Sequence, residues 1–381
     1  MNKQWMQFAD EVKKMYGKDF VPIHEPTFND KEVEYVTDCV KTGWVSSVGA
    51  YVTKFEEELA KFVGVKRAVA VVNGTAALHI ALKVAGVEAD DEVLMPSLTF
   101  IATANAVSYC GAIPHFIDVH KETLGVDPFK LDAYLSEISE VRNGKLFNKQ
   151  TNRCIKALVP MHTFGHAVHL VELVALAEKY HLVLVEDAAE SLGTYYKGKH
   201  TGSFGKVNAM SFNGNKIITT GGGGAILTDD EALADYAKHL TTTAKVPHKW
   251  EYVHDEIGYN YRMPNINAAL GCAQLEKMEQ FLEQKKQLAV KYDELLQGVD
   301  GVQLFKQPAH SDSNYWLQTL ILDESVERDE VLAFLNEQGV MSRPIWQPMH
   351  ELVMFEGCPK MDLVVTDRLK KWIVNIPSTP I

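Results

Sequence analysis

The chain has 381 residues, of which 46% are hydrophobic and 23% are charged, and its formal net charge at pH 7 is −12. This balance indicates a soluble globular protein with a sizeable core, two domains or one large domain with an appendage, and no membrane span. The negative charge argues against a nucleic-acid partner held through phosphates, and five scattered cysteines, odd in number, indicate reduced thiols and a cytoplasmic location.

The N-terminal part predicts one helix and one loop ahead of the first strand. Residues 1–20 form an amphipathic pattern, with apolar side chains about one helical turn apart, and we expect this helix to pack on the main body or on a partner chain. A small-residue loop, W-V-S-S-V-G, begins at Trp44. The pattern of this loop alone favours a simple connector.

The next unit predicts a strand, a tight turn and a helix. The apolar run A-V-A-V-V from Ala68 leads into Asn73-Gly74-Thr75 and then into strong helix formers. The first amides of a helix are unpaired and lie at its positive end, so Gly74 and Thr75 could hold a phosphate, although a plain capped helix fits the same residues. Phe100, before a later helix, could stack on a planar ring or belong to the core.

Three histidines follow the predicted strand 155–159. Gly165 argues against a helix that presents His162 and His166 on one face, and no nearby carboxylate or cysteine completes a zinc set with His169. We therefore expect no metal site, and instead a polar loop with His162 near a substrate.

The segment 182–228 carries the clearest chemical pattern. The apolar run L-V-L-V ends on Glu186-Asp187, and A-M-S-F-N-G-N-K, which contains Ser211, ends on Lys216 before four glycines. Ligands of parallel sheets bind at the carboxyl ends of the strands, so Asp187 and Lys216 should lie at the same edge. A lysine and an acid in this arrangement suit pyridoxal phosphate, with the lysine linked to the aldehyde and the carboxylate on the pyridinium nitrogen.

The C-terminal third predicts a connecting helix and a second domain. The segment 241–261 is a long polar and aromatic stretch that ends near Asn260, and a single long helix is expected at 265–296. Beyond it, strands and helices alternate differently over 316–372, typical of a compact α+β domain. Arg343 and Trp346 could contact a ligand or fill the domain interface. Neither a dinucleotide fingerprint nor a P-loop is present.

The motifs E-D-A-A-E-S-L-G at 186–193, S-F-N-G-N-K at 211–216 and T-G-G-G-G resemble the DegT/DnrJ/EryC1/StrS sugar aminotransferases, over about 22–377. Within the family, the chain looks most similar to enzymes of the bacillosamine and legionaminic acid pathways. The resemblance implies an α/β protein of pyridoxal-phosphate fold type I, aspartate aminotransferase-like, with a mainly parallel sheet in its large domain. The expected divisions are an N-terminal helix at 1–20, a large cofactor domain at 21–262, and a linking helix with a small α+β domain at 263–381.

The resemblance also implies roles for individual residues. Lys216 would carry the cofactor and move protons, and Asp187 would pair with the pyridinium nitrogen. Further cofactor contacts are expected from Gly74, Thr75, Phe100, Glu190, Ser211, Asn213 and Asn260, the last reaching the phosphate in the neighbouring subunit. Substrate contacts are expected from Trp44, His162, Arg343 and Trp346.

Two of these positions depart from the commonest family pattern. Asn213 stands where a histidine is frequent, and Glu190 stands where a glutamine often contacts the phenolic oxygen of the cofactor. A carboxylate there would repel a phenolate unless it is protonated or turned away.

The expected reaction is transfer of an amino group from glutamate to C4 of UDP-2-acetamido-4-keto-2,4,6-trideoxyglucose, in a homodimer with shared active sites. An aminotransferase for an eight-carbon keto sugar acid and a non-catalytic regulatory protein of the same fold remain as alternatives. A dehydratase with this cofactor is disfavoured, because the similar sugar dehydratases replace the lysine with histidine.

Overall fold

The central sheet of the computed structural model, which describes residues 3–381, is mainly parallel. Its strands lie in the order β1-β11-β10-β7-β6-β2-β3, and β5 and β4 extend it beside β6. The strands are β1 (Arg67–Val71), β2 (Glu92–Pro96), β3 (Ile113–Ile117), β4 (Ser139–Arg142), β5 (Lys145–Asn148), β6 (Cys154–Leu158), β7 (Val183–Asp187), β10 (Val207–Ser211) and β11 (Gly224–Thr228). The run from β10 through β7, β6 and β2 to β3 is parallel, whereas β11 is antiparallel to both of its neighbours. This arrangement confirms the predicted α/β class.

Both faces of this sheet are covered, as the near-continuous apolar strands predict. Along β1, Ala68 and Ala70 pack into one hydrophobic cluster, whereas Val69 and Val71 pack into another. This alternation follows from the period of two in a strand. The helices around the sheet are α3 (Ala50–Val63), α4 (Gly74–Val84), α5 (Ile101–Tyr109), α6 (Pro128–Ile138), α7 (Leu170–Lys179), α8 (Glu231–Thr241) and α9 (Asn265–Leu275), and α2 (Asp30–Thr42) packs on α9.

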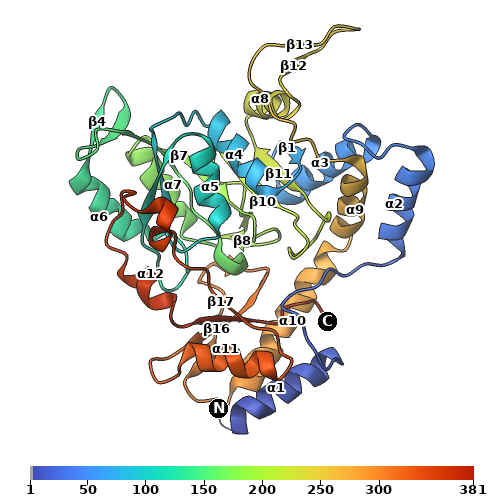
Figure 1. Cartoon of the computed structure of the whole chain (residues 1–381), viewed down its shortest axis with the longest axis vertical. Coiled ribbons are helices and arrows are strands. Elements are labelled where there is room, and N and C mark those ends of the chain that lie inside the picture. Colours follow the sequence, from blue (N-terminus) through green and yellow to red (C-terminus); the bar gives the residue numbers. More distant parts are fainter. Residues whose placement is uncertain (1–2) are drawn as a thin grey trace.

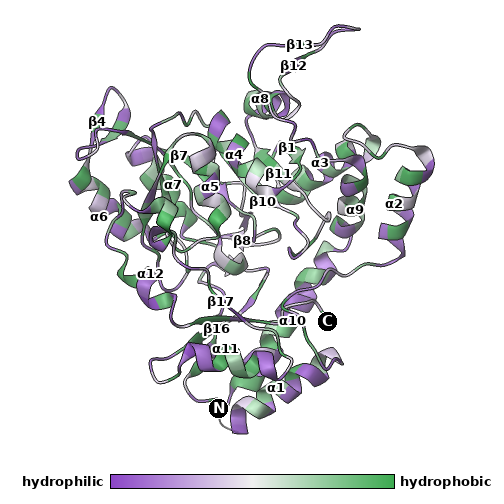
Figure 2. Ribbon diagram, in the orientation of Figure 1, coloured by the Kyte–Doolittle hydropathy of each residue, from purple (hydrophilic) through white to green (hydrophobic). Residues whose placement is uncertain are grey.

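A second, antiparallel sheet lies at the lower end of the molecule in Figure 1, with strand order β14-β16-β18-β17. Its elements are β14 (Val302–Leu304), β16 (Gln318–Leu322), β17 (Arg343–Pro344), β18 (Ile373–Ile376), α11 (Arg328–Glu337) and α12 (Val364–Leu369). The N-terminal helix α1 (Lys3–Tyr16) packs here through Trp5 and Phe8, in the same cluster as Leu288 of α10 (Met278–Leu296). Figure 2 shows both hydrophobic and hydrophilic residues along α1 and α11, as expected for helices with one buried face.

The prediction of a single long helix over 265–296 is wrong, because the segment forms two helices, α9 and α10, with a turn at Glu276 and Lys277 between them. Lys277 Nζ is paired with the buried Glu32 and lies 3.1 Å from Thr27 O. Gln274 Nε2 also donates to Thr27 O, at 2.9 Å. These bonds tie the turn to the segment before α2.

Five further short strands form a hairpin and a small three-stranded sheet. The segment 241–261 contains a hairpin of β12 (Lys245–Val246) and β13 (Val253–His254), which projects from the body in Figure 1. A small sheet joins β15 (Ser311–Asp312), β8 (Tyr195–Tyr196) and β9 (Lys199–His200). No helix within residues 3–381 is both long and apolar enough to cross a membrane.

Candidate active site

A cavity of about 310 Å³ opens at the carboxyl ends of β7 and β10, beside the start of α4. Its position is where ligands bind in parallel α/β sheets. The lining residues are Asn73, Gly74, Thr75, Leu78, Phe100, Ala102, Met161, Asp187, Ala189, Glu190, Ser211, Asn213, Asn215, Lys216, Trp316 and Trp346. Residues from distant parts of the sequence, among them the acid and lysine of the central motif, therefore meet at one site.

Asp187, the last residue of β7, presents a buried carboxyl group to this cavity. Its Oδ2 accepts a hydrogen bond from Thr103 Oγ1 at 2.7 Å, and its Oδ1 accepts one from the Ala189 amide at 3.2 Å. Burial raises the pKa of Asp187, while Thr103, Ala189 and Lys216 oppose this rise. A cationic ring nitrogen beside Asp187 would offset the penalty of burying its charge.

Lys216 follows β10 and is held between an aromatic ring and a carboxyl group. Its Nζ lies 3.8 Å from the centroid of the Trp316 ring and 3.3 Å from Glu190 Oε1. Trp316 is fixed in turn, because its Nε1 donates to Asn215 O at 2.6 Å. The amine is therefore oriented inside the cavity by two side chains.

Glu190 is the second buried carboxyl group of the cavity. Its Oε2 accepts a hydrogen bond from the Phe164 amide at 2.8 Å, so the carboxyl is not turned away from the site. Burial raises the pKa of Glu190 to about 7, although Lys216 opposes the rise. Glu190 can therefore be protonated near neutral pH, and this removes the repulsion expected of a carboxylate facing a phenolate.

The start of α4 forms a cradle suited to a phosphate. Asn73 caps the helix by accepting from the Ala76 amide at 2.8 Å. The amides of Gly74 and Thr75 have no hydrogen-bond partner among residues 3–381, and the hydroxyl groups of Thr75 and Ser211 lie on the same cavity. A Cβ on Gly74 would meet Ser211 Cβ at 2.7 Å, so a glycine lets the helix approach β10 this closely. Helix capping and phosphate binding are thus compatible here.

Aromatic side chains form one wall of the cavity. Phe100, 49% exposed, lies edge-on to Trp346, with ring centroids 6.2 Å apart. Trp346 also packs on Phe164, at 5.2 Å between centroids. Together, the acid, the lysine, the phosphate cradle and this wall fit pyridoxal phosphate: Asp187 would hold the ring nitrogen, Lys216 the aldehyde carbon, and α4 the phosphate.

Four of the expected site residues do not line the cavity. His162 is completely buried, and its Nε2 lies 2.9 Å from Glu186 Oε2, so the ring does not line the cavity and its substrate contact stays a prediction. Neighbouring side chains in a strand point to opposite faces, so Glu186 points away from the side of Asp187. The contact with Glu186 holds the His162 ring on that other side. Arg343, Trp44 and Asn260 are exposed and lie outside the cavity of this chain.

The sequence patterns did not predict that three further side chains contribute to the site. Thr103 lies one turn into α5, Trp316 precedes β16, and Phe164 lies in a short 3-10 turn. Each contacts a motif residue only through the tertiary structure.

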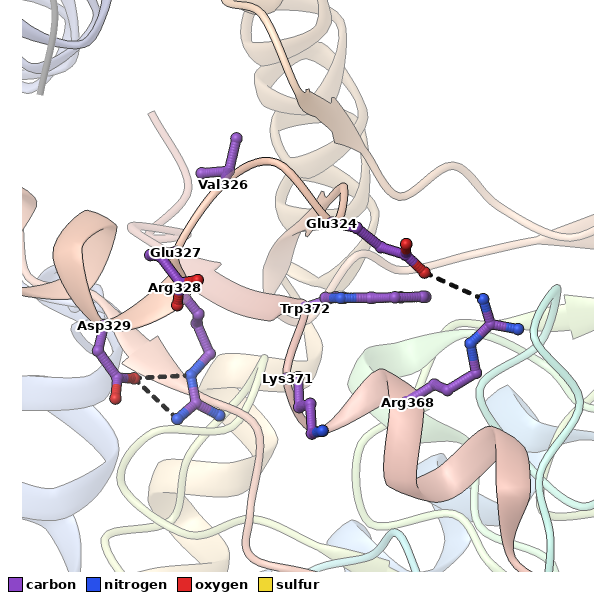
Figure 3. Close-up of a pocket in the computed structure, with 8 residues that line it drawn as sticks. All are labelled: Glu324, Val326, Glu327, Arg328, Asp329, Arg368, Lys371 and Trp372. Carbon is purple, nitrogen blue, oxygen red and sulfur yellow. Dashed lines mark hydrogen bonds and ion pairs between the residues drawn. The ribbon is translucent and has the colours of Figure 1, made fainter.

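Another hollow, drawn in Figure 3, lies beside α11 and α12 and contains Arg328, Arg368, Lys371 and Trp372. Its cations are largely paired within the hollow: Arg328 Nη2 lies 2.8 Å from Asp329 Oδ1, and Arg368 Nη2 lies 3.4 Å from Glu324 Oε1. The side chains of these two pairs are 27–82% exposed, so this hollow lacks the buried acid and amine of the cavity at β7 and β10.

Comparison with known proteins identifies the family. The model of the DegT/DnrJ/EryC1/StrS aminotransferase family matches residues 26–381. EpsN of Bacillus subtilis (strain 168), which is named as a pyridoxal phosphate-dependent aminotransferase, is 39% identical over 344 residues, covering 90% of this chain and 84% of EpsN. GDP-perosamine synthase of Escherichia coli O157:H7 is 37% identical over 361 residues, covering 95% of this chain and 94% of that enzyme.

A similar solved structure agrees with this result. The crystal structure of a DegT DnrJ EryC1 StrS aminotransferase from Brucella abortus has a TM-score of 0.82 at 29% identity, covering 92% of this chain and 90% of that one. The chain belongs to the DegT/DnrJ/EryC1/StrS aminotransferase family, has the α/β fold of its members, and is a sugar aminotransferase that depends on pyridoxal phosphate.

Proposed function

We propose that the protein transfers an amino group from glutamate to C4 of a nucleotide-linked 4-keto-6-deoxy sugar. The observation that carries this proposal is the convergence of Asp187, Lys216 and the start of α4 on one cavity with an aromatic wall. The first three suit the cofactor, and the wall of Phe100 and Trp346 suits a ring-shaped substrate, because aromatic faces pack on sugar and base rings.

Each side chain has a defined task in this proposal. Pyridoxal phosphate, when bound, supplies the electron sink for the carbanion at the reacting carbon. Asp187 keeps the ring nitrogen protonated. Lys216 binds the cofactor and then carries the proton to and from the reacting carbon. Gly74, Thr75 and Ser211 hold the phosphate, and Phe100 covers the ring.

The cavity also motivates the proposal that each site is shared between two chains. Lys216 is the only basic side chain among the described residues that line it. A cofactor phosphate and the carboxylates of glutamate need further donors, because buried anions must be paired. We propose a homodimer in which Asn260 reaches the neighbouring phosphate. In the same segment, Trp250, Tyr252 and Ile257 are exposed by 73%, 81% and 85%, as expected of residues that contact a partner.

The proposed sugar is UDP-2-acetamido-4-keto-2,4,6-trideoxyglucose, which would yield the UDP-linked 4-amino sugar and 2-oxoglutarate. A second candidate is GDP-linked 4-keto-6-deoxymannose, because a relative at 37% identity is named GDP-perosamine synthase. The two candidates share the reacting ketone and differ in the nucleotide and at C2, so the same cavity chemistry serves both.

The proposal is tested by turnover of a substrate panel with purified enzyme and glutamate. The panel contains both nucleotide sugars and an eight-carbon keto sugar acid, and products are identified by mass spectrometry. We expect the UDP-sugar to give the highest kcat/KM. A preference of more than about tenfold for the GDP-sugar, roughly 1.4 kcal/mol in transition-state binding, would move the assignment to the second candidate. Amination of the keto acid alone would contradict a nucleotide-sugar substrate.

A further inference from the structure

Glu190 and Lys216 form a buried pair inside the cofactor cavity. Glu190 Oε1 lies 3.3 Å from Lys216 Nζ, and their side chains are 2% and 12% exposed. The other carboxylate oxygen accepts a hydrogen bond from the Phe164 amide, and the Glu190 carbonyl oxygen accepts one from Asn314 Nδ2 at 2.9 Å. Both the carboxyl group and its backbone are therefore fixed against the amine.

A lysine must lose a proton before it can bind an aldehyde, because only the neutral amine is a nucleophile. In water a lysine has a pKa of about 10.4, so only roughly one amine in a thousand is neutral near pH 7.4. A proton acceptor in direct contact with Nζ would give this proton a route off the amine that does not depend on hydroxide from solution. Glu190 is the only carboxyl group recorded within hydrogen-bonding or ion-pair distance of Nζ among residues 3–381.

The surroundings of Glu190 favour proton uptake. Burial raises the pKa of this carboxyl to about 7, with the nearby charge of Asp187 adding to the rise and Lys216 opposing it. His24, in the N-terminal segment, is buried, and burial together with the charges of Lys285 and Lys216 holds its pKa well below the ordinary value. His24 is therefore neutral near pH 7 and does not compete for the proton.

We propose that Glu190 accepts the proton that Lys216 must lose before it binds the cofactor aldehyde. The Nζ–H bond breaks and an Oε1–H bond forms, the freed electron pair stays on Nζ, and nothing is oxidised or reduced. This step rests on the proposed assignment of Lys216 as the cofactor lysine. It also gives a reason for a glutamate at this position, since a glutamine cannot take up a proton near neutral pH.

A carboxylate that only held the ammonium in place would have the opposite effect. It would stabilise the charged lysine and slow its reaction, so its removal would speed up cofactor binding. The two roles can therefore be separated by the direction in which a neutral variant changes the rate.

The experiment measures how fast Lys216 becomes linked to pyridoxal phosphate. Cofactor-free wild type and Glu190→Gln are mixed with pyridoxal phosphate between pH 6 and 9, and the link is trapped with borohydride after set times. The labelled peptide is then quantified by mass spectrometry. Glutamine can still accept a hydrogen bond from the Phe164 amide, so the variant removes the proton acceptor and keeps this hydrogen bond. Glu276→Gln, which removes a carboxylate paired with Lys31 outside the cavity, is the matched control.

We expect the wild-type rate to rise with pH up to about 7, where Glu190 loses its proton, and then to level off, because above that pH the pair holds one proton that can move between the two groups. The Glu190→Gln rate should be roughly 100-fold lower at pH 7.5, within the usual range for a positioned acid or base. It should continue to rise with pH above 7.5, where the wild-type rate has levelled off. Comparing the two rates at each pH cancels the titration of the free cofactor.

Three outcomes would overturn the inference: a Glu190→Gln rate equal to or above wild type at pH 7.5, parallel pH profiles, or an equal loss in Glu276→Gln. The wild-type profile is informative even if the variant fails to fold, because the absence of a break near pH 7 contradicts the proton transfer. A wild-type label on a lysine other than Lys216 would instead overturn the assignment of the cofactor lysine.

Discussion

At the residue scale, the chemistry depends on buried groups whose charge is controlled by a few hydrogen bonds. The bond from Thr103 Oγ1 to Asp187 Oδ2 is the shortest of those that Asp187 accepts, at 2.7 Å, and both groups are buried. It favours the charged carboxylate, which is the form needed to hold a protonated ring nitrogen.

Replacing Thr103 with valine keeps the side-chain volume and removes this bond. We expect the pKa of Asp187 to rise further and the affinity for pyridoxal phosphate to fall by roughly 10- to 100-fold, since a hydrogen bond to a charged group contributes about 1.5–3 kcal/mol. Absorbance titration of the cofactor-free protein measures the dissociation constant. Thr163→Val, which removes a buried bond to Leu124 O, is the control, and an equal loss of affinity there would refute the role of Thr103.

Much of the cavity lining was predictable from sequence, because short motifs place residues at strand ends. Asp187 and Ser211 each end a parallel strand, so their meeting follows from the topology alone. The direction of a side chain is harder to predict. His162 also follows a strand, but its ring turns to Glu186 instead of the cavity, a pairing that requires knowing how β6 and β7 align. Trp316 could not be located at all, since it reaches Lys216 from the segment before β16, a strand of the second sheet.

At the element scale, the start of helix α4 explains how the site is formed where the cofactor phosphate would lie. The Asn73 side chain accepts a hydrogen bond from one of the first amides of α4 and leaves the amides of Gly74 and Thr75 without a partner. The start of the helix is therefore a preformed anion-binding site. The sequence predicted this strand, turn and helix because each has a strong local pattern.

Two other elements are decided by tertiary contacts, and the prediction for the first of them was wrong. The segment 265–296 has an almost unbroken helical pattern, yet the bonds of Lys277 and Gln274 to the segment before α2 break it into α9 and α10. The stretch 143–153 is polar, as is typical of an exposed loop, yet it includes β5, which pairs with β4 and β6. Local propensity does not include the partners that make these arrangements stable.

At the scale of the whole molecule, the proposed sharing of sites predicts complementation between inactive chains. Lys216→Ala lacks the reactive amine, and Asn260→Ala lacks the proposed contact to the neighbouring phosphate. A mixed dimer would contain one site with an intact Lys216 and an intact Asn260 from the other chain. Random pairing makes half of the dimers mixed, so co-refolded samples should recover about a quarter of wild-type activity.

The recovered activity must come from mixed dimers. These can be isolated by placing a different affinity tag on each of the two variants. Mixed dimers without activity would contradict a shared site. Activity in Asn260→Ala homodimers equal to wild type would show that the phosphate is held without this residue.

The central claim is that Lys216, set against Asp187 in one cavity, carries the cofactor of a sugar aminotransferase. The most direct measurement is borohydride reduction of the purified, cofactor-loaded protein followed by peptide mass spectrometry. We predict a single phosphopyridoxyl label on Lys216, no label in Lys216→Ala, and loss of the label when glutamate is added before the borohydride, because the amino donor releases the lysine. A label on another lysine, or a label that glutamate does not remove, would contradict the claim.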